Sequence, residues 1–295
     1  MSNEIPEIFG SPLQPTILSQ TDSIQFKCYK GISCFNACCK HADITLTPYD
    51  IIRLKTRLGI SSTEFLAKHA VPFELDGGGT PGLKMRTQDD VPTCLFVTDE
   101  GCSVYEDRPS ACRYYPLGLM SMRAKDAASE EAHFFLVKED HCKGHEEDNH
   151  LNIQQYRVEQ GVDEYDELNK EWFQIMLKKR SSGPTVGKPS ETSLQLFFMC
   201  SYDIDRFRRF VLSESFKTVY ELDNSIYAEL EKDDLKLMKF GFRLMKQVLF
   251  GEQTIALKEN AIDERIEKRK EHLALRRKME LEAHQKNSDV YDSLD

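Results

Sequence analysis

Four cysteines fall within twelve residues of this sequence, in the segment CYKGISCFNACCK at residues 28–40. The chain has nine cysteines, and eight of them lie between residues 28 and 142. In a reducing compartment, clustered cysteines ligate metals or carry out redox chemistry more often than they form disulfides. Eight thiolates match two four-thiolate sites, the ligand set of either zinc ions or cubane iron–sulfur clusters. The predicted metal ligands are Cys28, Cys34, Cys38, Cys39, Cys94, Cys102, Cys112 and Cys142.

Two of these thiols, Cys38 and Cys39, belong to neighbouring residues. In a helix their side chains point about 100° apart, and in a strand they point to opposite sides. Divergent neighbours suit two metal centres better than one shared ion. If the segment is helical, Cys34 shares a face with Cys38, because the two are four residues apart. The sequence therefore predicts a polynuclear thiolate centre, or two adjacent centres, with Cys38 and Cys39 at the junction.

A centre of this kind carries a large negative charge. Eight thiolates around two zinc ions, or around two oxidised cubanes, leave about −4, and a partly buried site needs cations to balance it. Arg108 and Arg113 flank Cys112, and guanidinium groups suit sulfur or carboxylate neighbours. We therefore expect these two arginines to contact the cofactor. Three lysines also adjoin cysteines and are expected to be solvated surface charges: Lys27, Lys40 and Lys143.

Histidines offer alternative ligands. His41, His141 and His145 lie close to cysteines in the sequence, and each could replace a thiolate in a site of three cysteines and one histidine. Because eight cysteines already suffice, we expect these histidines to be surface or core residues. The ninth cysteine, Cys200, stands in the apolar run LFFMC and is predicted to be a small buried hydrophobic residue.

Two short helices are expected to brace the cysteine segment. The first begins at Pro48, which Thr47 can cap, and ends at Gly59. The second follows at once, with Ser61 or Ser62 as its cap and a glutamate in its first turn.

Short strands are expected to carry the remaining cysteines. The turn DEG at residues 99–101 joins CLFV to CSVY, which places Cys94 and Cys102 on neighbouring strands. Residues 133–144 are predicted to form a strand that ends at Cys142. The glycine-rich segment DGGGTPG at 76–82 lacks the Lys-Ser/Thr of a phosphate-binding P-loop and is predicted to be an ordinary loop.

Downstream of the cysteines the sequence is mostly helical. Apolar residues recur at helical spacing in residues 152–180, 203–222 and 235–251, while the end of the chain is strongly charged. We therefore predict an α+β protein, in which an irregular cysteine-rich domain with short strands precedes a mostly α-helical part. The expected division is an arm (1–22), a metal-binding domain (23–150), a helical segment (151–180), a linker (181–193), a helical region (194–256) and a charged helical or disordered tail (257–295).

Composition narrows the class of protein further. A chain of 295 residues that is 40% hydrophobic can bury a substantial core without the help of disulfide bonds or structural metals. Its formal net charge of −10 argues against a nucleic-acid partner, because affinity for phosphates requires clustered Lys and Arg. No apolar run approaches the roughly 20 residues of a membrane span, and the first residues do not form an export signal, so we expect a cytoplasmic protein.

The cysteine pattern resembles that of the YkgJ-type cysteine-cluster family of zinc- or iron-chelating domains. The resemblance covers residues 26–145 and rests on CYKGISCFNACCK, on PTCLFVTDEGCSVYEDRPSACRYYPLG and on HCKG. It implies a metal centre held by the eight clustered cysteines. One departure concerns Cys34 and Cys38, which are separated by three residues where many members have two.

Three functions are compatible with these observations. The first is metal binding for structure or metal handling, with an iron–sulfur cluster or zinc as cofactor. The second is modification of a protein or small molecule by an iron enzyme, since the resemblance extends to flagellin lysine N-methylase, whose substrate is a protein. The third is an interaction module in which the metal domain presents the charged C-terminal segment to a protein partner.

Overall fold

The computed structural model describes residues 16–89, 91–122, 131–181, 189–259, 261, 267 and 270. The predicted α+β class is confirmed, with short antiparallel strand pairs in the cysteine-rich part and mostly helices after it. The strands are β1 (Ser23–Gln25), β2 (Ala70–Glu74), β3 (Pro81–Met85), β4 (Val97–Thr98), β5 (Gly101–Cys102), β6 (Leu117–Met122), β7 (Glu131–Leu136) and β8 (His150–Asn152). They pair as β1–β8, β2–β3, β4–β5 and β6–β7.

The described helices are of two kinds. The α-helices are α1 (Pro48–Leu58), α2 (Ser62–His69), α3 (Ser110–Tyr114), α4 (Ile153–Gln160), α5 (Val162–Ser181), α6 (Glu191–Tyr202), α7 (Ile204–Val211), α8 (Glu214–Lys217), α9 (Asn224–Lys232) and α10 (Asp234–Phe250). Three 3₁₀ helices are η1 (Ala37–His41), η2 (Tyr105–Asp107) and η3 (Lys143–Glu146). Within the described ranges, no helix combines the length and the apolar composition that crossing a membrane requires.

Both helices begin where the sequence predicts, and α1 also ends at the predicted residue. Thr47 and Asp50 form a capping box at the start of α1, and Gly59 closes it in the left-handed conformation with φ of 64°. Ser61 and Glu64 form the equivalent box at the start of α2. Local hydrogen bonding alone therefore specifies both helix starts.

Other predicted boundaries are wrong. The strand expected over residues 133–144 ends at Leu136, so Cys142 lies in the following loop and caps η3. The helix expected over 152–180 breaks at Gly161, whose φ of 62° ends α4. Residues 1–15, residues 182–188 of the linker and nearly all of the charged tail lie outside the described residues.

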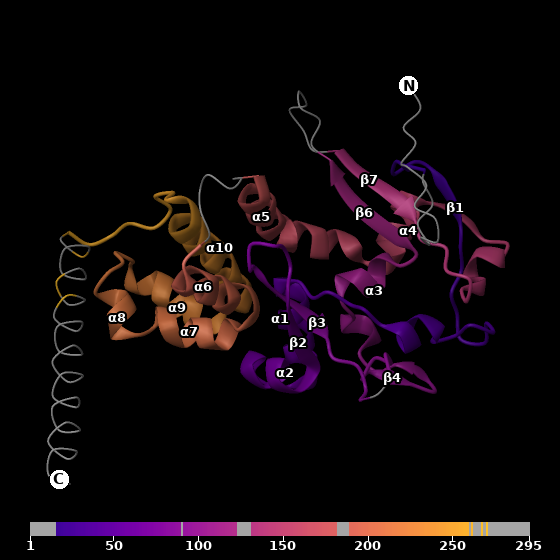
Figure 1. Cartoon of the computed structure of the whole chain (residues 1–295), viewed down its shortest axis with the longest axis horizontal. Coiled ribbons are helices and arrows are strands. Elements are labelled where there is room, and N and C mark those ends of the chain that lie inside the picture. The colour runs from indigo at the N-terminus through magenta and orange to yellow at the C-terminus, as the bar shows by residue number, and fades with distance from the viewer. Residues whose placement is uncertain are drawn as a thin grey trace, which may run out of the picture.

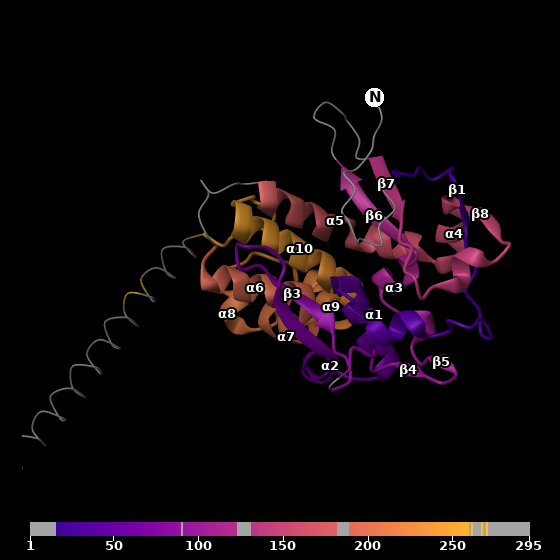
Figure 2. The ribbon, with the colours of Figure 1, turned by 45° about the vertical axis from the view of Figure 1, so that its right-hand side comes forward.

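Two hydrophobic cores organise the molecule. A small core surrounds Phe26 and Phe134 and draws on β1, β6, β7, β8 and α4. A large core draws on α1, α2 and β3 together with α5–α10 and includes Trp172, the only tryptophan of the chain. Helix α5 contributes Val162 to the small core and Tyr165 to the large one. Figures 1 and 2 show α6–α10 gathered at one end, β1, β6, β7 and α4 at the other, and α1 between them.

Candidate metal centre

Cys38 and Cys39 lie on the 3₁₀ helix η1. Asn36 precedes the helix with a φ of 66°, and its side-chain amide donates a hydrogen bond to the Thr98 carbonyl at 2.9 Å. This left-handed residue separates Cys34 from the helix, so Cys34 and Cys38 do not share a helical face. In a 3₁₀ helix successive side chains leave the backbone about 120° apart. The two sulfurs nevertheless lie 4.0 Å apart, so they are side by side and do not point to opposite sides.

A first group of thiols gathers around the loop that contains Cys142. The backbone N–H of Lys143 donates to the Cys34 sulfur at 3.2 Å. The N–H of Lys27 donates to the Gly144 carbonyl at 3.0 Å, which joins the segment of Cys28 to the same loop. Burial raises the pKa of Cys28 to about 11, and the charges of Cys38, Cys34 and Cys142 add to the effect.

A second group gathers around the hairpin of β4 and β5. The N–H of Cys94 donates to the Cys39 carbonyl at 2.8 Å, and Cys102 pairs with Val97 across the hairpin. Burial raises the pKa of Cys112, and the charges of Cys94 and Cys102 raise it further. The pKa of Cys39 is also raised, first by its contact with Cys38 and by burial, and then by the charges of Cys112 and Cys94.

Backbone amides point at several of these sulfurs. Burial raises the pKa of Cys94 and Cys102, but N–H groups of Phe96 and Val97 counter it at Cys94, and the N–H of Val104 does so at Cys102. Together with the Lys143 amide, these donors supply positive dipoles to at least three thiols. Hydrogen bonds of this kind stabilise thiolates and tune the metals that they hold.

The two arginines brace the site through carbonyl oxygens. Arg113 is buried, and its guanidinium donates to the carbonyls of Arg108, Gln160 and Glu106. Arg108 donates to the Tyr105 carbonyl and to the Gln160 side chain, and its charge lowers the pKa of Cys102 against the effect of burial. Arg108 therefore lies within electrostatic reach of a thiol. The prediction that both arginines contact the cofactor stays a prediction.

The histidines and lysines lie around the two groups. The rings of His41 and His141 are 6.2 Å apart, which brings the end of η1 next to the Cys142 loop. His145 has its Nε2 3.1 Å from the Val137 carbonyl, and its ring packs on Phe26 in the small core. Lys143 pairs with exposed Glu146, in keeping with a solvated charge.

Helix α1 holds α3, the helix of Cys112, through a buried carboxylate. Asp50 is 0% exposed, and its two oxygens accept the Ser110 N–H at 2.8 Å and the Ser110 hydroxyl at 3.1 Å. Arg53 also pairs with Asp107 at 2.6 Å, which ties α1 to η2. Helix α1 thus braces the segment of Cys112, whereas the prediction concerned the cysteine segment at residues 28–40.

Sequence reasoning missed Asp50 and Tyr115 as parts of this site. The capping pattern from Thr47 to Asp50 marks a helix start, but it carries no sign that the same carboxylate also anchors Ser110. Burial raises the pKa of Tyr115, and the adjacent Cys142 thiol and Glu139 carboxyl raise it further. The Tyr115 hydroxyl therefore lies beside a predicted ligand, a contact that only the folded chain creates.

The donor set fits a thiolate-bound metal centre in its chemistry, since eight thiols are available as ligands. Across the described residues, no three His, Cys, Asp or Glu side chains already meet at the spacing of one ion. Sites of this kind close as they bind metal, because metal affinity and local folding are coupled. The ninth thiol, Cys200, is 1% exposed in the large core, as predicted for a buried apolar residue.

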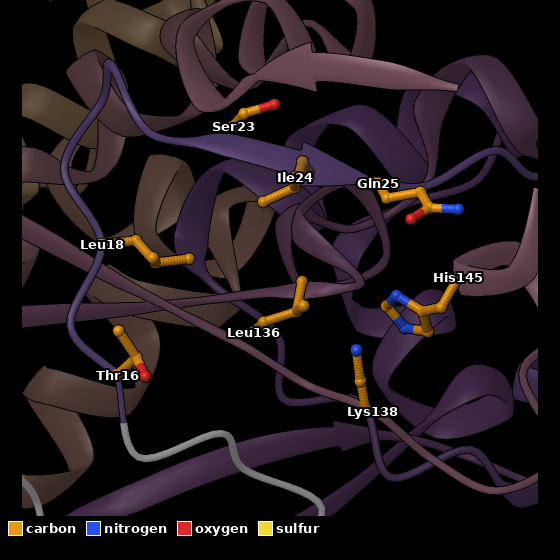
Figure 3. Close-up of a pocket in the computed structure, with 8 residues that line it drawn as sticks. All are labelled: Thr16, Leu18, Ser23, Ile24, Gln25, Leu136, Lys138 and His145. Atoms are coloured by element: carbon orange, nitrogen blue, oxygen red, sulfur yellow. The ribbon is translucent and has the colours of Figure 1, made fainter. Parts of the chain in front are cut away.

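A pocket of about 230 Å³ is lined by residues of β1 and of the chain before it, by Leu136 at the end of β7, and by Lys138 and His145. The side chains of His145, Lys138 and Gln25 lie at one end of it (Figure 3). No cysteine is among these lining residues.

Comparison with known proteins gives one match. Residues 27–143 match the family model CxxCxxCC, which is described as "Putative zinc- or iron-chelating domain". No curated protein and no solved structure matches the chain. All eight clustered cysteines fall inside the matched range, and Cys200 falls outside it. Residues 27–143 therefore match the model of this family, a finding that confirms the resemblance and supports metal binding by this region.

Proposed function

We propose that this protein is a metal chelator whose eight clustered thiolates hold a polynuclear centre, either an iron–sulfur centre or a zinc–thiolate centre. The observation that carries the proposal is the convergence of thiols from four stretches of chain. Cys38 interacts with thiols of both groups, because its charge raises the pKa of Cys28 and of Cys112. A single zinc ion takes four ligands, so eight neighbouring thiolates require more than one metal.

Hydrogen bonding to sulfur favours an iron–sulfur centre. Backbone N–H groups donate to the sulfurs of Cys34 and Cys94. Donors of this kind stabilise the charge of an iron–sulfur cluster and tune its reduction potential.

Metal and sulfide analysis of protein purified without oxygen tests the proposal. We expect a brown protein with broad absorption near 400 nm, in which acid-labile sulfide accompanies iron. A colourless protein with two or more zinc ions per chain would support the zinc form. A fully loaded protein with one metal ion, or a protein without metal, would contradict the proposal.

A matched pair of variants controls this experiment. Cys38→Ser should reduce the metal content, because it removes the thiol that interacts with both groups. Cys200→Ser changes a thiol in the large core and should leave the metal content unchanged.

A further inference from the structure

We infer that Asp50 is a positioning residue for the predicted metal centre, an inference that rests on the proposed function. From helix α1, Asp50 supplies the N-terminal cap that helix α3 lacks, and in this way it holds the Cys112 thiol where a metal can bind it. Asp50 is not among the predicted ligands, so it acts on the metal only through α3.

Helix α3 does not hold its own first turn. It has five residues, Ser110–Tyr114, and helices this short are marginal without tertiary contacts, because a first turn fixes several residues for few hydrogen bonds. Pro109 occupies the cap position and makes no side-chain hydrogen bond to the helix. The first N–H groups of α3 therefore need an acceptor from another part of the chain.

Asp50 is that acceptor. One of its carboxylate oxygens accepts the Ser110 N–H at 2.8 Å, and the other accepts the Ser110 hydroxyl at 3.1 Å. The second oxygen also accepts the Thr47 N–H at 2.8 Å, as part of the capping box of α1. A single buried carboxylate thus caps two helices. Cys112 lies two residues after Ser110, so a shift of this turn would move its sulfur.

Asp50 is itself held in place. Its neighbours Ile51 and Leu54 are buried in the large core, which fixes α1. Arg53 pairs with Asp107 at 2.6 Å and so fixes η2, the segment that leads into α3. A buried group on a packed helix is able to set the position of its neighbour to the precision that a binding site requires.

Metal affinity should therefore depend on a residue outside the cysteine pattern. A thiol that is already in position binds metal without first ordering the chain around it, because metal binding and local folding are coupled. Replacing residues that support metal ligands typically lowers metal affinity by about 10–100-fold.

Zinc titration of the full chain in competition with a chelator tests the inference. Asp50→Ala should weaken zinc binding by about tenfold or more, because α3 loses its cap. Thr47→Ala is the matched control, since the Thr47 hydroxyl accepts the Asp50 N–H at 3.3 Å and caps α1 alone. This control should keep wild-type affinity. Equal weakening in both variants, or wild-type affinity in Asp50→Ala, would overturn the inference.

A second variant serves if Asp50→Ala does not fold. Ser110→Pro removes both the N–H and the hydroxyl that Asp50 binds, and leaves the cap of α1 unchanged. Proline suits the first position of a helix, so the substitution is compatible with α3. Ser110→Pro should weaken zinc binding as Asp50→Ala does, and wild-type affinity would overturn the inference.

Alkylation of the metal-free chain separates this inference from the proposed function. We expect Cys112 to react several-fold faster in Asp50→Ala and in Ser110→Pro than in wild type, because α3 opens more often without its cap. Cys142 should react at the wild-type rate and serves as the internal reference. An unchanged rate at Cys112 would overturn the inference. Wild-type protein that binds neither zinc nor iron with sulfide would instead refute the proposed function.

Discussion

Gly144 shows how closely one residue constrains the predicted metal centre. A Cβ atom at this position would lie 2.6 Å from the Phe26 ring and 3.0 Å from the Lys27 carbonyl oxygen. The carbonyl belongs to the backbone, so the backbone would have to shift to relieve that contact. The glycine therefore permits the contact between the segments of Cys28 and Cys142.

We predict that Gly144→Ala destabilises the fold by about 1–3 kcal/mol, the usual cost of overpacking, and lowers the metal content. Urea denaturation and metal analysis measure the two effects. Gly77→Ala is the matched control, because nothing lies within 4 Å of a Cβ atom at that position. Equal behaviour of the two variants would show that the close contact at Gly144 does not matter.

At the residue scale the sequence revealed the thiols but not their surroundings. Eight clustered cysteines stand out by type and spacing, and the separate character of Cys200 follows from its apolar neighbours. The amides that point at sulfur, such as Lys143 N–H, belong to the backbone and leave no trace in residue type. Arg113 illustrates the same limit, because its three carbonyl partners come from turns that only the folded chain brings together.

The loop between β2 and β3 is organised by one carboxylate. Asp76 accepts hydrogen bonds from the Thr80 N–H at 3.1 Å and from its hydroxyl at 2.7 Å, and pairs with Lys179 of α5 at 3.2 Å. Burial alone would raise the pKa of Asp76, but these partners outweigh it and lower the pKa to about 2. The glycine-rich segment was predicted to be an ordinary loop. It forms the turn between the paired strands β2 and β3.

The direction of this pKa shift gives a pH-dependent prediction. A carboxyl whose folded pKa lies below its usual 3.8 stabilises the fold fully above about pH 4 and loses that contribution as the pH falls toward 2. Asp76→Asn should therefore cost about 2 kcal/mol at pH 7, and the difference from wild type should shrink toward zero near pH 2. Urea unfolding followed by Trp172 fluorescence at several pH values measures it. A difference that is constant with pH would refute the assignment.

Helix starts were predictable from the sequence, and helix breaks were less so. The boxes at Thr47 and Ser61 are local patterns that depend on residues three positions apart. Gly161 lies inside a continuous helical pattern, and it ends α4 by adopting the left-handed conformation with φ of 62°. The strand that was expected to reach Cys142 stops at Leu136 because its partner β6 runs only from Leu117.

The large core joins the cysteine-rich part to the C-terminal helices. Phe65 of α2 and Phe207 of α7 are both 0% exposed within it. A network of charges reinforces the contact, since Lys55 of α1 pairs with Asp205 at 3.2 Å and with Asp234 at 2.9 Å, and Arg208 pairs with both carboxylates.

We predict that Lys55→Met destabilises the whole molecule by roughly 2–3 kcal/mol, because it leaves two partly buried carboxylates with one shared cation, Arg208, in place of two. Thermal or urea unfolding followed by Trp172 fluorescence reports the change. Lys236→Met is the control, since Lys236 pairs with Glu229 at 3.0 Å on the exposed surface, where such pairs contribute about 0–1 kcal/mol. Similar losses in both variants would contradict a special role for the Lys55 network.

X-ray absorption at the metal edge of protein purified without oxygen tests the central claim most directly, because it identifies the atoms bound to the metal. We predict a shell of sulfur ligands, at about 2.3 Å if the metal is zinc. We also predict iron–iron scattering if a cluster is bound. A shell made mainly of nitrogen and oxygen would contradict thiolate ligation, because the eight thiols would then not be the ligands.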